Sequence, residues 1–359
     1  MNLYVWRYNT TTNSYQKTAV IDEYVSIIWI TRFYKAGNFE LYIPASIQNF
    51  KQFTPGKIEI LLTRDDWDGA MIVEGINLKT DPENGDYLTV TGRSAESILG
   101  RRIIPQQTNF TGTAENCIRS LINQNVINPT NANRKINNFV LGPAQGYTDT
   151  IDKQVTGKNL LDTISEICAA YGYGFRVTFD GTNFNFNLYK GTDRSTDQTT
   201  NPPVVFSPDY ENLGNTEYTY DLQQFKTAVY VAGEGEGSNR KIYALGYTAA
   251  SDMFRREIWV DSRNTSSTTE SGELTPEEYN AIMGEQAKEA LRENMFQLDF
   301  NGEILNANSY VYGVDYSLGD KVSVINEYGI KGTTNVSEIT EVEDESGYKL
   351  VPTFSEWSV

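Results

Sequence analysis

The side chain that enzymes use most often for acid–base chemistry is absent from this sequence. It contains no histidine, which removes the commonest general base, the usual partner of a nucleophile and the commonest metal ligand. A pair of carboxylates could still hydrolyse a glycosidic bond. Glu166 lies beside the apolar stripe of a predicted helix, and Glu40 lies in a predicted strand. Because the chain has 47 Asp and Glu residues, solvated or ion-paired side chains are the simpler interpretation of both.

A second group of carboxylates has the oxygen ligands that calcium prefers. Asp65, Asp66 and Asp68 precede Gly69 in a short turn. Their spacing does not match the calcium-binding loop of the EF-hand, which also needs a glutamate six residues after its glycine. The sequence therefore favours a turn with solvated aspartates, and predicts neither a metal nor another cofactor.

Two further features could suggest a reactive or ligand-binding site. Cys117 and Cys168 fall on the apolar stripes of two predicted helices, which indicates buried free thiols, although a disulfide between the helices remains open. The loop Gly233–Gly237 alternates glycine with glutamate, whose charge would repel a phosphate. We interpret this loop as a flexible hairpin tip.

Composition excludes several other classes of protein. The chain has 359 residues, 12% of them aromatic, and a formal net charge of −17. No run of basic residues could replace the counterions of a duplex, and Arg101-Arg102 is better suited to a carboxylate or to a salt bridge between subunits. The N-terminus does not resemble a secretory signal, and no segment has the apolar length of a membrane span. We therefore expect a protein of cytosol-like solvent, unless it leaves the cell within a particle.

Alternating apolar residues and turn signals predict that the first third of the chain consists of strands. We expect positive φ at Gly37 and Asn38 in the first hairpin turn, and we expect Pro44 to end its strand. The predicted strands are Tyr24–Ile30, Asn38–Ile43, Lys57–Thr63, Ala70–Leu78 and Tyr87–Gly92.

The middle of the chain changes to the period of a helix. Thr113 caps one predicted helix, and a second begins near Asn159 and ends at Gly172. A hairpin follows, in which Phe175–Phe179 and Phe184–Leu188 flank an Asp180-Gly181 pair that suits a type I′ turn.

The remainder is predicted as strands interrupted by one helix. Glu217–Ala232 and Arg240–Tyr247 have strand character, and Asp261–Gly272 is predicted to be a mobile loop. Thr275-Pro276-Glu277-Glu278 contains a helix cap, a proline suited to the first turn and a capping box. We expect that helix to end near Asn294, and strands to return from Phe296 to Val359.

Three segments resemble a known protein family. Gly37-Asn38-Phe39-Glu40-Leu41-Tyr42-Ile43-Pro44 is similar to the beginning of phage tail hub proteins. The segment from Gly92 to Ile104, GRSAESILGRRII, is similar to the part that closes their first barrel. Leu318–Val322, Ile339–Val342 and Pro352-Thr353-Phe354 are similar to their C-terminal ending. The family is that of siphophage baseplate hub, or tail-tip, proteins: the N-terminal structural part of tail-associated lysins, with a fold like that of the myophage hub.

The resemblance implies a β-dominated α+β fold, with two barrel-like tube domains and inserted peripheral α+β domains. We predict a first barrel-like domain over residues 1–105 and a peripheral α+β domain over 106–203. A second β region with a helix is predicted over 204–295, and a C-terminal barrel-like segment over 296–359. Many family members continue into a lytic domain, whereas this sequence stops at Val359, so we expect no enzymatic activity.

The resemblance also implies partners. We expect a homotrimeric ring that continues the tail tube, contacts the distal tail protein ring, the tape measure protein and receptor-binding or fibre proteins, and takes part in genome ejection. DNA would pass through an acidic lumen without specific binding, and no stable membrane insertion is expected. The protein would be assembled in the host bacterial cytoplasm and reside at the virion tail tip. Two alternatives are a carboxylate-dependent cell-wall hydrolase and a carbohydrate-binding tail accessory protein.

Overall fold

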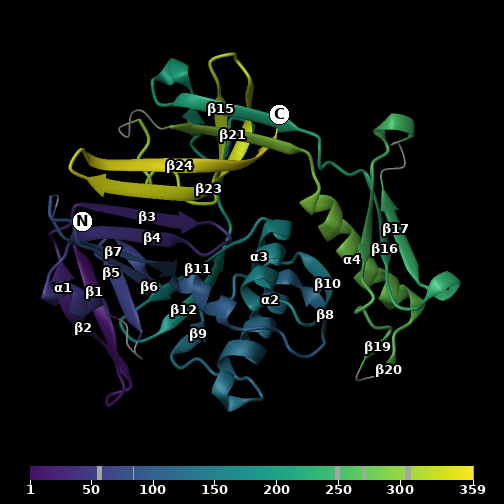
Figure 1. The fold of residues 1–359 in the computed structure, drawn as a ribbon. Helices are drawn as coiled ribbons and strands as arrows, with labels where there is room; N and C mark the ends of the chain where they lie inside the picture. The colour runs from purple at the N-terminus through teal and green to yellow at the C-terminus, as the bar shows by residue number, and fades with distance from the viewer. Residues whose placement is uncertain (55–58, 84, 247–250, 270–271, 304–308, 359) are drawn as a thin grey trace.

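The computed structural model is dominated by strands (Figure 1), and it describes all residues except 55–58, 84, 247–250, 270–271, 304–308 and 359. Within the described residues, fifteen strands form one sheet that runs from the N-terminal to the C-terminal part of the chain. The β-dominated α+β class predicted from the sequence is therefore confirmed. Four separate apolar cores support this framework.

The first unit comprises seven strands and one short helix: β1 (Leu3–Asn9), β2 (Ser14–Ile21), β3 (Ser26–Arg32), β4 (Asn38–Pro44), α1 (Ile47–Phe53), β5 (Ile60–Arg64), β6 (Trp67–Lys79) and β7 (Tyr87–Ser94). Its core is built from inward-facing strand residues, among them Trp29, Phe39 and Leu62. The hairpin β1–β2 was not predicted, because its polar residues hide the alternating pattern. The start of the predicted strand Lys57–Thr63 lies outside the described residues.

Two details of the predicted turns are wrong. Neither Gly37 nor Asn38 has a positive φ. Glycine is needed at position 37 for space instead, because a Cβ atom there would lie 2.0 Å from the carbonyl oxygen of Ile30. In the later hairpin only Gly181 has a positive φ, of 93°, whereas a type I′ turn needs two such residues. The Asp180 carboxylate completes that turn by accepting the backbone N–H groups of Thr182 and Asn183.

The peripheral unit follows the short 3₁₀ helix Ala95–Arg101. It packs against the side of the first unit that carries Ala70. Its elements are β8 (Thr108–Thr113), α2 (Ala114–Ile122), β9 (Phe139–Leu141), β10 (Thr150–Val155), α3 (Leu160–Tyr171), β11 (Gly174–Phe179) and β12 (Phe184–Tyr189). The predicted cap at Thr113 and the predicted helix start near Asn159 are confirmed, and the left-handed Gly172 ends α3. Its core continues into the first unit through Leu61 and Ile72, so these two units share apolar packing.

The C-terminal unit combines strands that are far apart in the sequence: β13 (Asp193–Arg194), β14 (Val205–Phe206), β22 (Lys321–Ile325), β23 (Lys331–Asp344) and β24 (Gly347–Ser358). Its core joins Val204, Phe206 and Leu213 with Tyr316 and Phe354. A two-stranded ribbon of β15 (Gly214–Asp221) and β21 (Gln297–Glu303) lies beside these strands (Figure 1). The domain boundaries after residues 105, 203 and 295 stay predictions.

Residues 222–296, here called the arm, are inserted between the two strands of that ribbon. The arm contains β16 (Ala228–Ala232), β17 (Ile242–Gly246), β18 (Glu257–Asp261), β19 (Thr268–Thr269), β20 (Gly272–Glu273) and α4 (Pro276–Glu293). The chain leaves at Asp221 and returns at Gln297, and these two residues are paired across the ribbon. The capping box at Thr275 and Glu278 is confirmed. Figure 1 shows the arm reaching away from the C-terminal strands and standing beside β8 and β10.

Candidate assembly site

The first and C-terminal units meet where β3 pairs with β23. Six consecutive residues of β3, Ile27–Arg32, pair in antiparallel register with Glu338–Glu343 of β23. Because backbone hydrogen bonds cross this boundary, the two units form one continuous sheet rather than two stacked bodies. We call this pairing and the side chains around it the junction.

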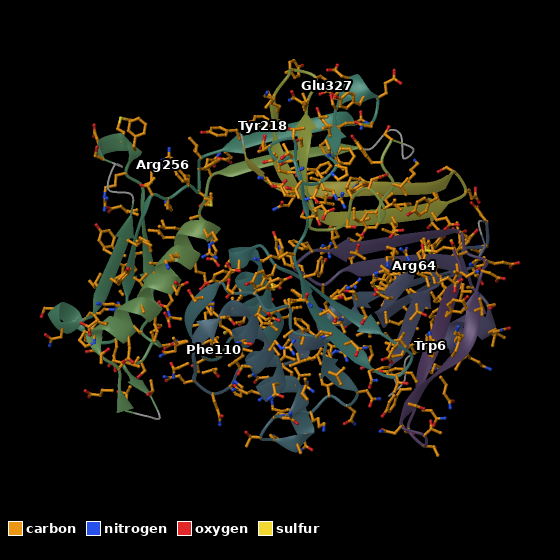
Figure 2. All side chains as sticks on the ribbon, turned by 180° about the vertical axis from the view of Figure 1, so that it is seen from behind. Trp6, Arg64, Phe110, Tyr218, Arg256 and Glu327 are labelled. Carbon is orange, nitrogen blue, oxygen red and sulfur yellow. The ribbon has the colours of Figure 1, made fainter. Side chains whose placement is uncertain are left out.

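A buried ion pair holds the junction from inside. Arg64 at the end of β5 donates from Nη2 to Oε1 of Glu341 on β23 over 2.7 Å, and both side chains are 5% exposed or less. The Tyr348 hydroxyl donates to Glu341 over 2.6 Å, and the Arg64 guanidinium lies 5.3 Å from the ring centre of Trp29. Figure 2 shows Arg64 in the body of the molecule, on the opposite side from Arg256 of the arm. Without Glu341, the buried Arg64 would keep only the exposed Asp66, 3.0 Å from its Nε, as a counter-ion.

A second ion pair lies at the other end of the same strand pairing. Arg32 donates from Nε to Glu338 over 2.5 Å, and its Nη1 donates to the Ala36 carbonyl oxygen and to Oδ1 of Asn38. Arg32 is about one quarter exposed. This arginine therefore fixes the turn between β3 and β4 to the C-terminal unit.

The first two family-like segments contact each other in the fold. Gly37 and Ser94 exchange hydrogen bonds: the Gly37 N–H donates to the Ser94 hydroxyl over 2.7 Å, and the Ser94 N–H donates to the Gly37 carbonyl. At Gly92, a Cβ atom would lie 1.8 Å from the Ile72 carbonyl oxygen. The Glu96 carboxylate accepts the N–H of Val177 in β11 over 2.7 Å, and burial raises its pKa. These residues therefore join strands, and Gly37, Ser94 and Glu96 also line the cleft described below.

The third family-like segment fixes the linker between the peripheral and C-terminal units. The buried Asp320 carboxylate accepts the Thr192 N–H over 2.7 Å and the Ser317 N–H over 2.9 Å. It also accepts from Nε of Arg194 over 2.9 Å. Gly319 beside it has a φ of 93°, in the left-handed region that favours glycine.

A cleft of about 810 Å³ opens beside the junction, between the three units. The aspartates of the predicted turn lie along it, where Asp66 contacts Arg64 at 3.0 Å and Asp68 contacts Arg176 at 3.3 Å. Basic side chains therefore already neutralise two of the three carboxylates that could have bound calcium. The cleft has no cluster of carboxylates among the described residues that could hold a metal.

The structure separates the two carboxylates singled out in the sequence and gives one of them a different partner. Glu40 is exposed on β4. Glu166 on α3 lies against Glu289 of α4, where Lys153 of β10 contacts Glu289 at 2.8 Å and Lys158 contacts Glu166 at 3.1 Å. We call these four residues the dock, because they join the peripheral unit to the arm. No local pattern in the sequence indicated that Glu289 or Lys153 belongs to it.

The two carboxyl groups of the dock shift each other's pKa in opposite directions. Burial, together with the hydrogen bond to Glu289 and its charge, raises the pKa of Glu166. Burial also opposes the charge of Glu289, but the two lysines and the hydrogen bond from Glu166 outweigh it and lower the pKa of Glu289 to about 2. A retaining glycosidase needs two carboxylates that face a sugar about 5 Å apart. Here lysines occupy the space around the pair, and the hollow beside Glu166 and Glu289 holds only about 20 Å³.

The other sequence-predicted residues have structural surroundings. Cys117 and Cys168 are buried and free, and burial raises the pKa of the Cys117 thiol to about 12. Arg101 pairs with Glu59 at 2.7 Å, so it has a carboxylate partner within its own chain. Glu234, from the glycine-rich loop, accepts the Ser267 N–H over 2.9 Å. That bond also restrains the segment predicted to be mobile, of which residues 270–271 lie outside the described part of the chain.

No helix in the described part of the chain is long and apolar enough to cross a membrane.

Solved structures of tail proteins, two of them from prophages, have a similar fold, so this chain has the fold of a tail protein. The tail protein of Neisseria meningitidis MC58 matches with a TM-score of 0.56 at 16% identity, over 99% of this chain and 96% of that one. The 43 kDa tail protein of prophage MuSo2 from Shewanella oneidensis matches with 0.56 at 11% identity, over 99% and 98%. Prophage tail protein gp18 of Listeria monocytogenes matches with 0.54 at 10% identity, over 99% and 95%.

The particular family is given by the sequence itself. Residues 2–354 match the model of the Siphovirus ReqiPepy6 Gp37-like protein family, and the chain belongs to that family. No curated protein matches the chain. The resemblance to siphophage tail proteins is therefore confirmed over almost the whole length, and the chain is a structural protein of a phage tail.

Proposed function

We propose that this protein is the baseplate hub of a siphophage tail tip, in which three copies form a ring that continues the tail tube. The observation that carries the proposal is the junction. It fuses two β-units of one chain into a continuous sheet through β3 and β23 and locks them with the buried pair of Arg64 and Glu341. A subunit with two fused β-units lets three copies present six such units around an axis.

The same proposal gives the protein no catalytic role. The family and the similar folds are those of tail proteins. The carboxylate pair at the dock is contacted by lysines, and the hollow that both Glu166 and Glu289 line holds only about 20 Å³. The ring would contact the distal tail protein ring above it and the tape measure protein inside it, with receptor-binding or fibre proteins outside. DNA would pass through during ejection without specific binding.

The mass of the native particle tests the ring. A trimer has three times the chain mass of 40.5 kDa, and we expect this species by native mass spectrometry and light scattering, with a ring in electron micrographs. Mixing with the distal tail protein of the same phage should give a larger complex. A chain that stays monomeric at high concentration, both alone and with that partner, contradicts the proposal.

A further inference from the structure

The arm presents a sheet face that its own helix does not cover. Strands β17, β16 and β18 form a three-stranded sheet. Val229 and Val231 face α4, where they pack with Tyr279 and Met283. Because strand residues alternate between faces, Tyr230 points to the opposite side. We call that side the outer face.

Two aromatic side chains form the middle of the outer face. Tyr230 of β16 and Trp259 of β18 are register partners in the parallel pair. Trp259 is 54% exposed. The register partner of Tyr230 on β17 is Ala244. Ile242, two residues away on the same face of β17, is 54% exposed. The two aromatic residues therefore start from adjacent positions of neighbouring strands on a face that also carries an exposed isoleucine.

Each end of this aromatic strip carries an arginine paired with a carboxylate. At one end Arg255 contacts Glu257 at 2.6 Å and donates to the Tyr230 hydroxyl over 3.1 Å. At the other end Arg240 pairs with Asp261, and its guanidinium lies 5.7 Å from the ring centre of Trp259. Arg240 is also fixed by bonds to the carbonyl oxygens of Ala232 and Gly233. The polar groups at both ends are thus held in place before any ligand arrives.

We propose that the outer face binds a neutral oligosaccharide. The C–H faces of the sugar rings would lie on Trp259 and Tyr230, since an aromatic face is the negative side of its quadrupole. The sugar hydroxyls both donate and accept hydrogen bonds, which suits arginines that donate beside carboxylates that accept. This role goes beyond the proposed tail-ring function and involves none of the residues of the junction.

The charges on this face distinguish a sugar from a nucleic acid. Arg240 and Arg255 are each neutralised by a carboxylate, so the face lacks the free positive charge that a phosphate backbone requires. The two ion pairs place fixed N–H donors beside carboxylate acceptors at both ends of the aromatic strip, which suits the hydroxyl groups of a polar and uncharged ligand.

The test uses the full chain and three defined probes: maltohexaose, cellohexaose and chitohexaose, titrated by calorimetry and by tryptophan fluorescence. We expect at least one probe to bind and Trp259→Ala to weaken that binding tenfold or more. Trp259→Phe should keep part of the affinity while losing most of the fluorescence change. Tyr328→Ala is the matched control, because Tyr328 is 89% exposed but lies outside the arm.

Three outcomes would overturn the proposal: no probe binds, Trp259→Ala binds as well as the wild type, or Tyr328→Ala weakens binding equally. If Trp259→Ala binds every sugar as the wild type does but no longer self-associates, the face is instead a contact between protein chains. An unchanged melting temperature shows that each variant is folded. Ring formation is measured separately, so this proposal and the tail-ring function can fail independently.

Discussion

The junction and the dock join parts of the same chain in opposite ways. At the junction, β3 and β23 share backbone hydrogen bonds around an ion pair that is almost fully buried. At the dock, the contacts are side-chain ion pairs and polar bonds such as that between Gln154 and Ser266. Among the described residues, the apolar clusters on the two sides of each contact have no member in common, so backbone pairing is what distinguishes the junction. We therefore expect the junction to belong to the rigid body of the subunit, and the arm to separate from that body more easily.

The largest expected effect comes from breaking the buried pair at the junction. Glu341→Ala removes the buried partner of Arg64 and leaves it with only the exposed Asp66, which we expect to cost about 3 kcal/mol of unfolding free energy, the lower end for a broken buried pair. Chemical denaturation measures this loss. Arg93→Ala is the matched control, because the pair of Arg93 and Glu74 is on the surface and contributes about 1 kcal/mol or less. Similar losses in both variants would contradict the rigid junction.

A second change tests the close approach of strands next to the junction. Gly92→Ala forces a Cβ atom against the Ile72 carbonyl oxygen, and overpacking of this kind costs about 1–3 kcal/mol. Gly100→Ala is the control, since its nearest neighbour would be an atom of Leu161 at an ordinary 3.4 Å. Thermal melts should show a clear decrease for the first variant and little change for the second. A Gly92→Ala variant as stable as the wild type would show that the strands can move apart there.

At the dock, the expected effect is local. Lys153→Met removes the cation that contacts Glu289, and losing the partner of such a partly buried group costs about 1–3 kcal/mol. We expect faster hydrogen exchange in residues 262–269, with exchange in β3 and β23 unchanged. Lys288→Met is the control, because Lys288 pairs with Glu285 within α4. Faster exchange throughout the sheet would mean that the dock and the junction are one cooperative unit.

The smallest expected effect is a pH dependence of the dock. The pKa of Glu166 is raised and that of Glu289 is lowered to about 2. The protonated form of Glu166 is favoured at the dock, so the stability that Glu166 gives to the docked arm is lost as pH rises through its raised pKa. The ionised form of Glu289 is favoured there, so the stability that Glu289 gives is lost as pH falls towards 2. Docking should be strongest near the ordinary pKa of glutamate and weaken above it, although Lys153 and Lys158 limit the change. Hydrogen exchange between pH 5 and 8, corrected for intrinsic rates, measures it.

The matched variant for this pH dependence is Glu166→Gln. Glutamine has no proton to lose, so exchange in residues 262–269 should no longer vary on the alkaline side. A variant with the same pH dependence as the wild type would assign the titration to another group.

Local patterns in the sequence were sufficient for most elements of the fold. The caps at Thr113 and Thr275 depend on residues three positions apart, and both were predicted correctly, as was the helix start near Asn159. The contact between the two N-terminal family-like segments, across β4 and β7, was not predicted. The hairpin turns were predicted less well, since φ at Gly37 depends on how β3 and β4 diverge.

The candidate site could not be predicted in the same way. Arg64 and Glu341 are 277 positions apart, and Lys153 and Glu289 are 136 positions apart. In a chain with 47 acidic residues, no local feature indicates which carboxylate will meet which base. The alternation around Trp259 is visible in the sequence, but which face α4 covers is decided only by packing.

The paired residues Asp221 and Gln297 have a consequence for how such proteins diversify. Because the arm leaves and re-enters the ribbon at adjacent positions, a short turn could close the gap and leave the neighbouring strands in register. Recombination at these two points could exchange one arm for another in a single event, without altering the rest of the gene product. The ribbon is therefore a natural splice point, at which a lineage could acquire new surface properties while keeping the body of its tail unchanged.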